Sequence, residues 1–238
     1  MASNPVVLVP TQAARPQEVI FAGDGVRLAG QMEYPVSSAP PSGYPLLFVL
    51  PQASCHTREE YDDFAHVALD RGYAVFRWDK RGTGRSGSSG TGSAVQDAVN
   101  AYETALTQNS INRHRVVIMA LGAGTSLLGS CFGLFARVQP PMGALLIANM
   151  LDETAITAIN TRIQIVNGAK DWTPADQYAE AAAIAHQATY RYGADFYVTP
   201  DADRMLMTDR NGTTHLHASA RKVISSWLHT LLHPSRFV

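Results

Sequence analysis

The chain of 238 residues is poor in cysteine, with only Cys55 and Cys131. Two cysteines provide no disulfide framework of the kind that stabilises small secreted domains. An excess of either charge is also absent, because 19 Lys and Arg residues stand against 20 Asp and Glu residues. No block of like charges occurs in the sequence. Neither nucleic acid nor an anionic membrane surface is therefore an expected partner.

Long apolar segments are absent as well. Apolar segments such as residues 143–151 are far shorter than the roughly 20 residues with which a helix crosses a bilayer. Residues 6–9 form a short apolar run near the N-terminus, but no basic residue precedes it and no clear cleavage site follows. We therefore do not interpret the N-terminus as a signal peptide, and we expect a cytoplasmic protein.

Apolar residues are plentiful, at 46% of the chain, which is enough for a continuous core. Short apolar segments alternate with amphipathic ones, a pattern typical of a mostly parallel, twisted α/β sheet with helices on both faces. Residues 17–22 and 26–34 flank a Gly-Asp-Gly turn and predict an antiparallel N-terminal hairpin. Because no internal linker is visible, we expect a single domain over residues 17–238, preceded by an N-terminal arm at 1–16.

Further strands are predicted at residues 46–50, 73–78, 116–121, 143–148, 162–168 and 195–199. Thr57 with Glu60, and Ser93 with Gln96, match the capping box that opens a helix. Residues 149–161, between two of the strands, form a connection near the upper end of ordinary loop lengths. They leave no room for an inserted lid domain.

The most specific motif is Asp-x-Arg-Gly-x-Gly-x-Ser, from Asp79 to Ser86. Its glycines permit backbone conformations that a Cβ would hinder, and its polar side chains can tie the turn by hydrogen bonds. This motif, within residues 71–86, resembles the turn after the fourth strand in small α/β-hydrolases of the serine-aminopeptidase and esterase type. The order of predicted elements from residue 26 to 232 follows the same family. The resemblance implies an α/β-hydrolase fold without a lid domain, and a catalytic serine, acid and histidine at defined positions.

The nucleophile of this family lies in a Gly-x-Ser-x-Gly turn between a strand and a helix. The strand at residues 116–121 leads into Gly122-Ala123-Gly124-Thr125-Ser126. Matching Gly122 to the first glycine of the motif puts Gly124 at the nucleophile position, where no side chain can attack. Loss of the nucleophile of a triad removes about six orders of magnitude in turnover.

Three other residues stay open as nucleophiles. Ser126 is close to the expected place but in the first helical turn, where hydroxyls usually bond to the backbone. Cys131 lies in Gly-x-Cys-x-Gly, a sequence that resembles the turn of dienelactone-hydrolase-like enzymes, although we favour a packed core thiol. Cys55, in the loop after the strand at 46–50, is the third.

The family acid follows the seventh strand in Gly-x-x-Asp, which Asp171 matches. The family histidine follows the last strand, where the best placement puts Arg204. Arginine stays protonated and cannot serve as a general base. The competing placement uses His215, just before the final helix. His215 and His217 lack a third nearby ligand, so we expect no metal site, and no cofactor is implied.

The loop after the third strand, which forms the oxyanion hole in the family, usually carries His-Gly. Here Pro51 and Gln52 stand in place of these residues, so this loop departs from the oxyanion-hole pattern of the family. A ligand pocket above the sheet is expected from Gln52, Ala53, Cys55, Gly124, Thr125, Asp171 and Arg204.

These substitutions favour a non-catalytic hydrolase-fold protein that serves as a binding or assembly subunit. Its partner would be another protein, with residues 1–16 as a docking arm, or a small anion held by Arg204 beside the glycine-rich helix start. One alternative is an esterase- or peptidase-like hydrolase that uses Cys55, Ser126 or Cys131 with His215 and Asp171.

The other alternative is a nucleotide-binding protein with Gly122-Ala123-Gly124 as its phosphate-binding turn. Leu127 then stands at the third glycine position, where close packing of helix and strand disfavours its bulk. Gly82, Gly84 and Gly87 also fit the glycine pattern, but no helix opens directly after them.

Overall fold

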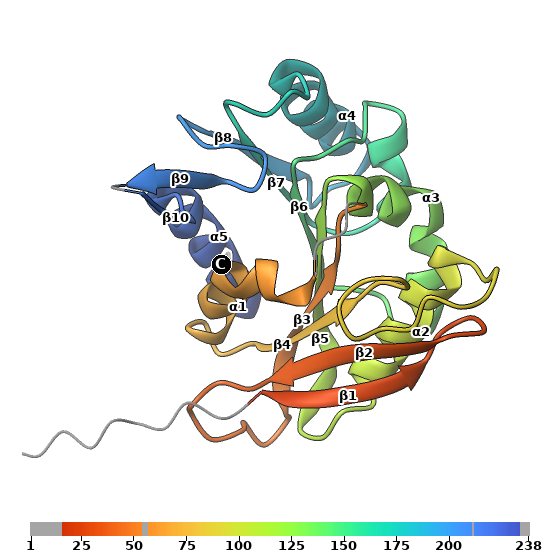
Figure 1. Cartoon of the computed structure of the whole chain (residues 1–238). Helices are drawn as coiled ribbons and strands as arrows, with labels where there is room; N and C mark the ends of the chain where they lie inside the picture. The colour runs from red at the N-terminus through yellow and green to blue at the C-terminus, as the bar shows by residue number, and fades with distance from the viewer. Residues whose placement is uncertain (1–15, 54–56, 211, 234–238) are drawn as a thin grey trace, which may run out of the picture.

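A computed structural model describes residues 16–53, 57–210 and 212–233 of the chain. An eight-stranded sheet with the order β1-β2-β4-β3-β5-β6-β7-β8 lies at its centre (Figure 1). Strand β2 runs antiparallel to its neighbours β1 and β4, and all other neighbouring strands are parallel. The strands are β1 (Gln17–Ala22), β2 (Arg27–Glu33), β3 (Tyr44–Leu50), β4 (Ala74–Asp79), β5 (Ile111–Leu121), β6 (Gly143–Ile147), β7 (Ile163–Gly168) and β8 (Ala194–Thr199).

Helices cover both faces of this sheet, because side chains alternate between the faces along each buried strand. In β3, Leu46, Phe48 and Leu50 join one apolar cluster, while Leu47 and Val49 join the other. The first cluster packs against α2 (Ala94–Leu106), α3 (Ala123–Val138) and α4 (Ala182–Thr189), the last preceded by a π-helical turn at Asp176–Ala181. The second packs against α1 (Asp62–Leu69) and α5 (Ala218–Leu232).

The predicted fold class is confirmed: a mostly parallel sheet begins with an antiparallel hairpin and carries helices on both faces (Figure 1). Between β6 and β7 the chain holds only the 3-10 turn Ala155–Ala158, so no lid domain is inserted there. Within the described residues, no helix is long and apolar enough to cross a membrane. Most of the predicted arm, residues 1–15, lies outside the described residues, as does Cys55.

The two predicted helix caps differ in outcome. The Ser93 hydroxyl accepts a hydrogen bond from the Gln96 amide at 3.4 Å and caps α2 as expected. The Thr57 side chain makes no capping bond, and the chain enters α1 through the 3-10 turn Arg58–Tyr61. In that tighter turn the Glu60 amide bonds to the Thr57 carbonyl oxygen instead.

The Asp79–Ser86 turn is tied as its sequence predicts. The buried Asp79 carboxylate accepts hydrogen bonds from the amides of Arg58 (2.9 Å) and Arg85 (3.0 Å). The Ser86 hydroxyl donates to the Asp79 carbonyl at 2.6 Å and accepts from the Ala29 amide at 2.9 Å. A side chain at Gly84, where φ is +49°, would collide with the Asp79 carboxylate. These bonds fix the start of the turn beside the carboxyl end of β3.

Candidate functional site

The bend between β5 and α3 has its apex at Gly122, with φ 51° and ψ −119°. Residues with side chains rarely adopt this conformation, whereas glycine tolerates it. The apex lies two residues before Gly124, so the sequence register that placed Gly124 at the bend is wrong. Gly124 lies inside the first turn of α3, where an added Cβ would come within 2.7 Å of the Leu50 carbonyl oxygen. Gly124 thus permits α3 to approach β3 closely.

The guanidinium of Arg204 occupies the space above this bend. Its Nη2 lies 2.9 Å from where a Cβ on Gly122 would stand, and its Nε lies 3.5 Å from that point. Its Nη1 donates to Oδ1 of Asp171 at 2.8 Å. The Asp171 side chain is fully buried, while that of Arg204 is 22% exposed. The guanidinium carbon also lies 4.7 Å from the ring centroid of Trp172, a cation–π distance.

The loop that carries Arg204, residues 200–206, is held from several sides. Gly168 at the end of β7 packs so closely that a Cβ there would overlap the carbonyl oxygens of Ala202 and Asp203. The Asp203 carboxylate accepts from the amides of Met205 (2.9 Å) and Met207 (2.8 Å). The buried Leu206 is held at φ +61°, a strained value for a bulky residue. The backbone of this loop therefore fixes where Arg204 points.

His215 lies in a different setting from the one predicted. It belongs to β10 (Thr213–Leu216), which pairs with β9 (Met207–Arg210) in a separate two-stranded sheet, opposite Thr208. The sequence placed it in a loop, because these short strands lack a strong apolar alternation. Oδ1 of Asp171 accepts from Arg204 and from the Thr173 amide at 3.2 Å, and its buried Oδ2 has no hydrogen-bond partner among the described residues.

Two of the three alternative nucleophiles, Ser126 and Cys131, lie within α3, while Cys55 is outside the described residues. Ser126 follows the bend by four residues and is partly buried in the first part of the helix. Cys131 lies further along, where its thiol donates to the Leu127 carbonyl oxygen at 2.8 Å. Burial raises the pKa of the Cys131 thiol, which keeps it protonated and unreactive.

In the described part of the loop after β3, Gln52 bonds to side chains of other elements, and its Oε1 lies 3.5 Å from where a Cβ on Gly122 would stand. The Gln52 amide donates to the Tyr61 hydroxyl oxygen at 3.1 Å, and burial raises the pKa of Tyr61 to about 12. The Gln52 side chain donates to the Met205 sulfur at 3.4 Å. Thr125, also expected in a pocket, is buried and bonds to the Gly122 carbonyl (2.7 Å) and the Met150 amide (3.0 Å). These bonds hold both residues in place at this edge of the sheet.

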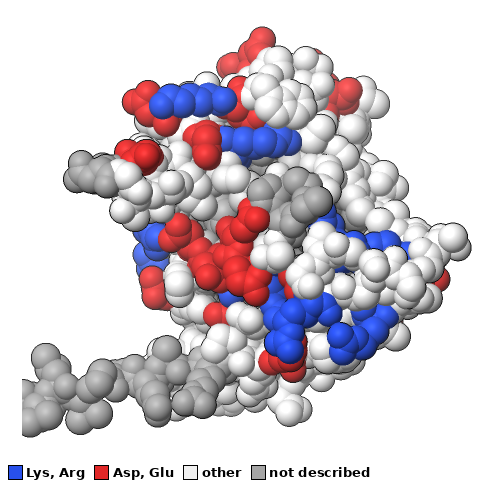
Figure 2. Space-filling view, in the orientation of Figure 1, with Lys and Arg blue, Asp and Glu red and all other residues white. Residues whose placement is uncertain are grey.

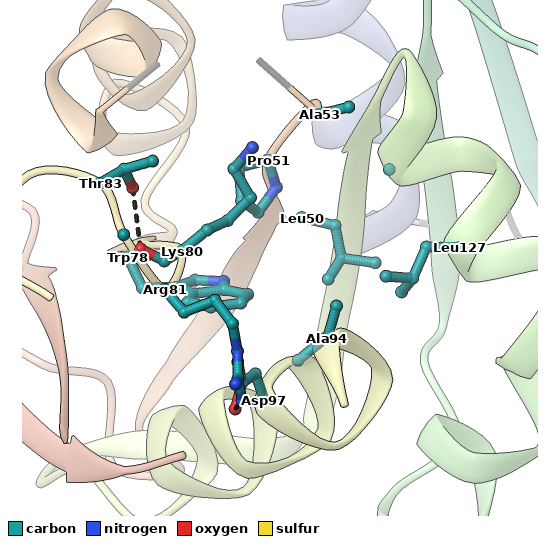
Figure 3. Close-up of a pocket in the computed structure, with 13 residues that line it drawn as sticks. Leu50, Pro51, Ala53, Trp78, Lys80, Arg81, Thr83, Ala94, Asp97 and Leu127 are labelled. Atoms are coloured by element: carbon teal, nitrogen blue, oxygen red, sulfur yellow. Dashed lines mark hydrogen bonds and ion pairs between the residues drawn. The ribbon is translucent and has the colours of Figure 1, made fainter. Parts of the chain in front are cut away.

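A cavity of about 350 Å³ opens beside Gly124, between the carboxyl end of β3, the turn after β4, and the helices α2 and α3 (Figure 3). Its lining comprises Leu50, Pro51, Ala53, Trp78, Lys80, Arg81, Gly82, Thr83, Ala94, Asp97, Ala98, Gly124 and Leu127. Of the residues predicted to line a pocket, Ala53 and Gly124 do so here, while Gln52, Thr125, Asp171 and Arg204 do not. The sequence-based prediction did not include the residues of α2 and of the turn after β4 that line this cavity. The turn motif and the Ser93 helix cap could have placed both elements at this edge of the sheet.

Charged side chains are not spread evenly over the face that Figure 2 shows. Acidic side chains gather over α1 and the 3-10 turn before it, where Glu59 and Asp62 are exposed, and basic ones lie nearer the turn after β4, where Arg85 is exposed (Figure 2). In the described parts of the chain, no group of three His, Cys, Asp or Glu side chains is placed to hold a metal ion.

No protein-family model matches this chain, and no curated protein matches its sequence. Solved structures do match its fold. A putative α/β-hydrolase from Agrobacterium tumefaciens is 19% identical over 91% of this chain and 96% of its own, with a TM-score of 0.66. A dienelactone hydrolase-like promiscuous phosphotriesterase from metagenomic libraries is 16% identical over the same shares, also with a TM-score of 0.66. An esterase domain from Rhodothermus marinus is 17% identical over 90% and 98%, with a TM-score of 0.63. The chain has the α/β-hydrolase fold.

Proposed function

We propose that this protein is a non-catalytic member of the α/β-hydrolase fold that binds a small molecule without hydrolysing it. One observation carries the proposal. At the bend between strand and helix, Gly122 presents no side chain, and the guanidinium of Arg204 fills the space above it. Several proteins of similar structure are named as hydrolases, and Gly122 and Arg204 are the two residues of this chain that argue against such an activity.

The chemistry of hydrolysis in this fold requires a nucleophile on the bend and a base beside it. Gly122 supplies no attacking atom. Arg204 is paired with Asp171, as a catalytic histidine would be with its acid, but a guanidinium cannot accept a proton at neutral pH. Without nucleophile and base, binding groups can contribute only the residual rate that remains when a triad is removed.

The experiment that tests this proposal combines turnover with active-site labelling. The full chain is assayed on nitrophenyl acetate and nitrophenyl butyrate, and is treated with a fluorophosphonate and with iodoacetamide before and after heating. We expect no turnover above that of a matched Ser126→Ala, His215→Ala variant. Iodoacetamide is expected to modify Cys131 only after unfolding, because the native thiol is buried and hydrogen-bonded.

If the protein is instead a hydrolase with an unusual nucleophile, ester turnover and labelling of the native protein are expected. Stoichiometric labelling of Ser126, Cys131 or Cys55 in the native protein, lost on heating and accompanied by ester turnover, would refute the non-catalytic proposal.

A further inference from the structure

The cavity beside Gly124 exists because the residues around its opening are small. Ala53 comes from the loop after β3, and Ala94 and Ala98 from the first turns of α2. Gly124 adds nothing on the side of α3, where close contact with β3 forbids a side chain. Larger residues at these positions would fill the space.

The floor of the cavity is apolar and fixed. Leu50 is 1% exposed and Trp78 is 4% exposed, so both belong to the packed interior, and Leu127 lies across from them (Figure 3). The indole N–H of Trp78 donates to the Val49 carbonyl oxygen at 3.0 Å. The polar atom of Trp78 is therefore satisfied within the protein, and its ring offers apolar surface.

The polar side of the cavity is lined by the cations Lys80 and Arg81 and by one carboxylate, Asp97. Asp97 is 2% exposed, and both its oxygens accept from Arg81, at 2.6 and 2.9 Å. Arg81 donates in addition to the Asp24 carbonyl oxygen at 2.9 Å. The Asp97 and Arg81 charges thus offset each other within the wall of the cavity. Lys80 donates to the Gln52 carbonyl oxygen and adds its positive charge to this side.

We infer that this cavity binds a small amphipathic carboxylate, with an aromatic or branched apolar body on the Leu50–Trp78–Leu127 floor and the carboxylate toward Lys80. The inference rests on the proposed function and names its ligand class. The volume of about 350 Å³ is near the lower end for ligand pockets, so it suits one ring and excludes a dinucleotide. A charge-assisted hydrogen bond at the edge of an apolar cavity discriminates a carboxylate from its neutral amide.

The test measures binding of phenylacetate and of its neutral isostere, phenylacetamide, to the full chain by calorimetry and by NMR. We expect saturable binding of phenylacetate, and binding of phenylacetamide weaker by about tenfold or more. Ala94→Trp is expected to abolish binding, because Ala94 is exposed at the first position of α2 and the indole would fill the cavity. Ala218→Trp, at the exposed first position of α5, is the matched control and is expected to bind normally.

Two substitutions of Lys80 test the role of its charge. Lys80→Met is expected to remove the preference for the carboxylate, and Lys80→Arg to retain it, with thermal unfolding confirming that both variants are folded. Equal affinity of wild type for the two compounds, binding unaffected by Ala94→Trp, or no binding at all would each overturn the inference.

The same samples are assayed for hydrolysis of nitrophenyl phenylacetate. This second readout distinguishes a refutation of the cavity assignment from a refutation of the proposed non-catalytic function. Phenylacetate binding at the cavity together with ester turnover would leave the cavity assignment standing and refute the non-catalytic role. Absence of both would refute the cavity assignment and leave the non-catalytic role standing.

Discussion

The ion pair between Arg204 and Asp171 joins a partly exposed cation to a fully buried carboxylate. Removing the cation strands that carboxylate in the interior, which is more costly than losing both charges together. We expect Arg204→Met to lower the free energy of unfolding by about 2–4 kcal/mol, the smaller side of the range for buried pairs because Arg204 is partly solvated. Urea unfolding measures the change.

The double variant Arg204→Met, Asp171→Leu serves as the control for this prediction. It removes both charges and is expected to recover at least half of the lost stability, since no charge remains buried. Unchanged stability in Arg204→Met alone would show that the pair contributes nothing to holding the loop at residues 200–206.

The sequence placed Arg204 and Asp171 at the same edge of the sheet, because both follow strands whose carboxyl ends share that edge, but their ion pair is known only from the structure. The position of the bend was not. Gly122-Ala123-Gly124 offers a glycine in two registers, two residues apart, and a motif comparison cannot choose between them. The choice is made by the backbone: Gly122 takes the positive φ, and Gly124 takes the close contact with Leu50.

Among the strands and helices, the end of β7 and the loop after β8 make the tightest contact of the site. Gly168→Ala would press a methyl group against the carbonyl oxygens of Ala202 and Asp203. We expect it to lower the free energy of unfolding by about 1–3 kcal/mol through overpacking. Gly133→Ala, exposed in α3 with no atom near the added methyl, is the control, and it is expected to be neutral or stabilising by up to about 1 kcal/mol. Equal melting temperatures for the two variants would contradict this account.

Helix α4 carries a titratable anchor, His186, which is fully buried and bonds through Nε2 to the Ile159 carbonyl oxygen at 2.8 Å. Burial lowers the pKa of His186, so between its folded pKa and the ordinary value near 6.5 the unfolded chain binds the extra proton. The stability contributed by neutral His186 is therefore complete above about pH 6.5 and is lost as the pH falls below it.

Urea unfolding at pH 7 and pH 5 tests this dependence. We expect wild type to lose more stability over that interval than His186→Gln, whose amide can donate to the same carbonyl and does not titrate. His229→Gln, which changes an exposed histidine of α5, is expected to keep the wild-type dependence. Identical pH profiles for wild type and His186→Gln would exclude His186 as the source.

The main strands and helices were predictable because each has a clear period and a marked boundary, such as the Ser93 cap of α2. The β9–β10 hairpin was missed. Its four-residue strands form a sheet of their own, and His215 there follows two exposed threonines rather than an apolar alternation. The cavity could not be predicted either, since its volume depends on how four elements pack and not on any one of them.

Across the sheet as a whole, two apolar clusters share the same strands, one containing Trp78 and the other Trp227. Because neither cluster can form without the sheet, we expect a single cooperative unfolding transition. In a Trp172→Phe background, which removes the exposed indole, the variants Trp78→Phe and Trp227→Phe each retain one reporter. Fluorescence and far-UV circular dichroism should give coincident midpoints in each variant. Separated midpoints would mean that the two faces unfold independently.

The glycine at the β5–α3 bend also limits which substitutions this site tolerates. Any residue with a Cβ at position 122 would incur about 1–3 kcal/mol of backbone strain, and its side chain would meet the guanidinium of Arg204. Installing a hydroxyl there would thus destabilise the protein before any catalysis could begin. Introducing a nucleophile at this position therefore requires compensating substitutions elsewhere, Arg204 among them, before a side chain fits.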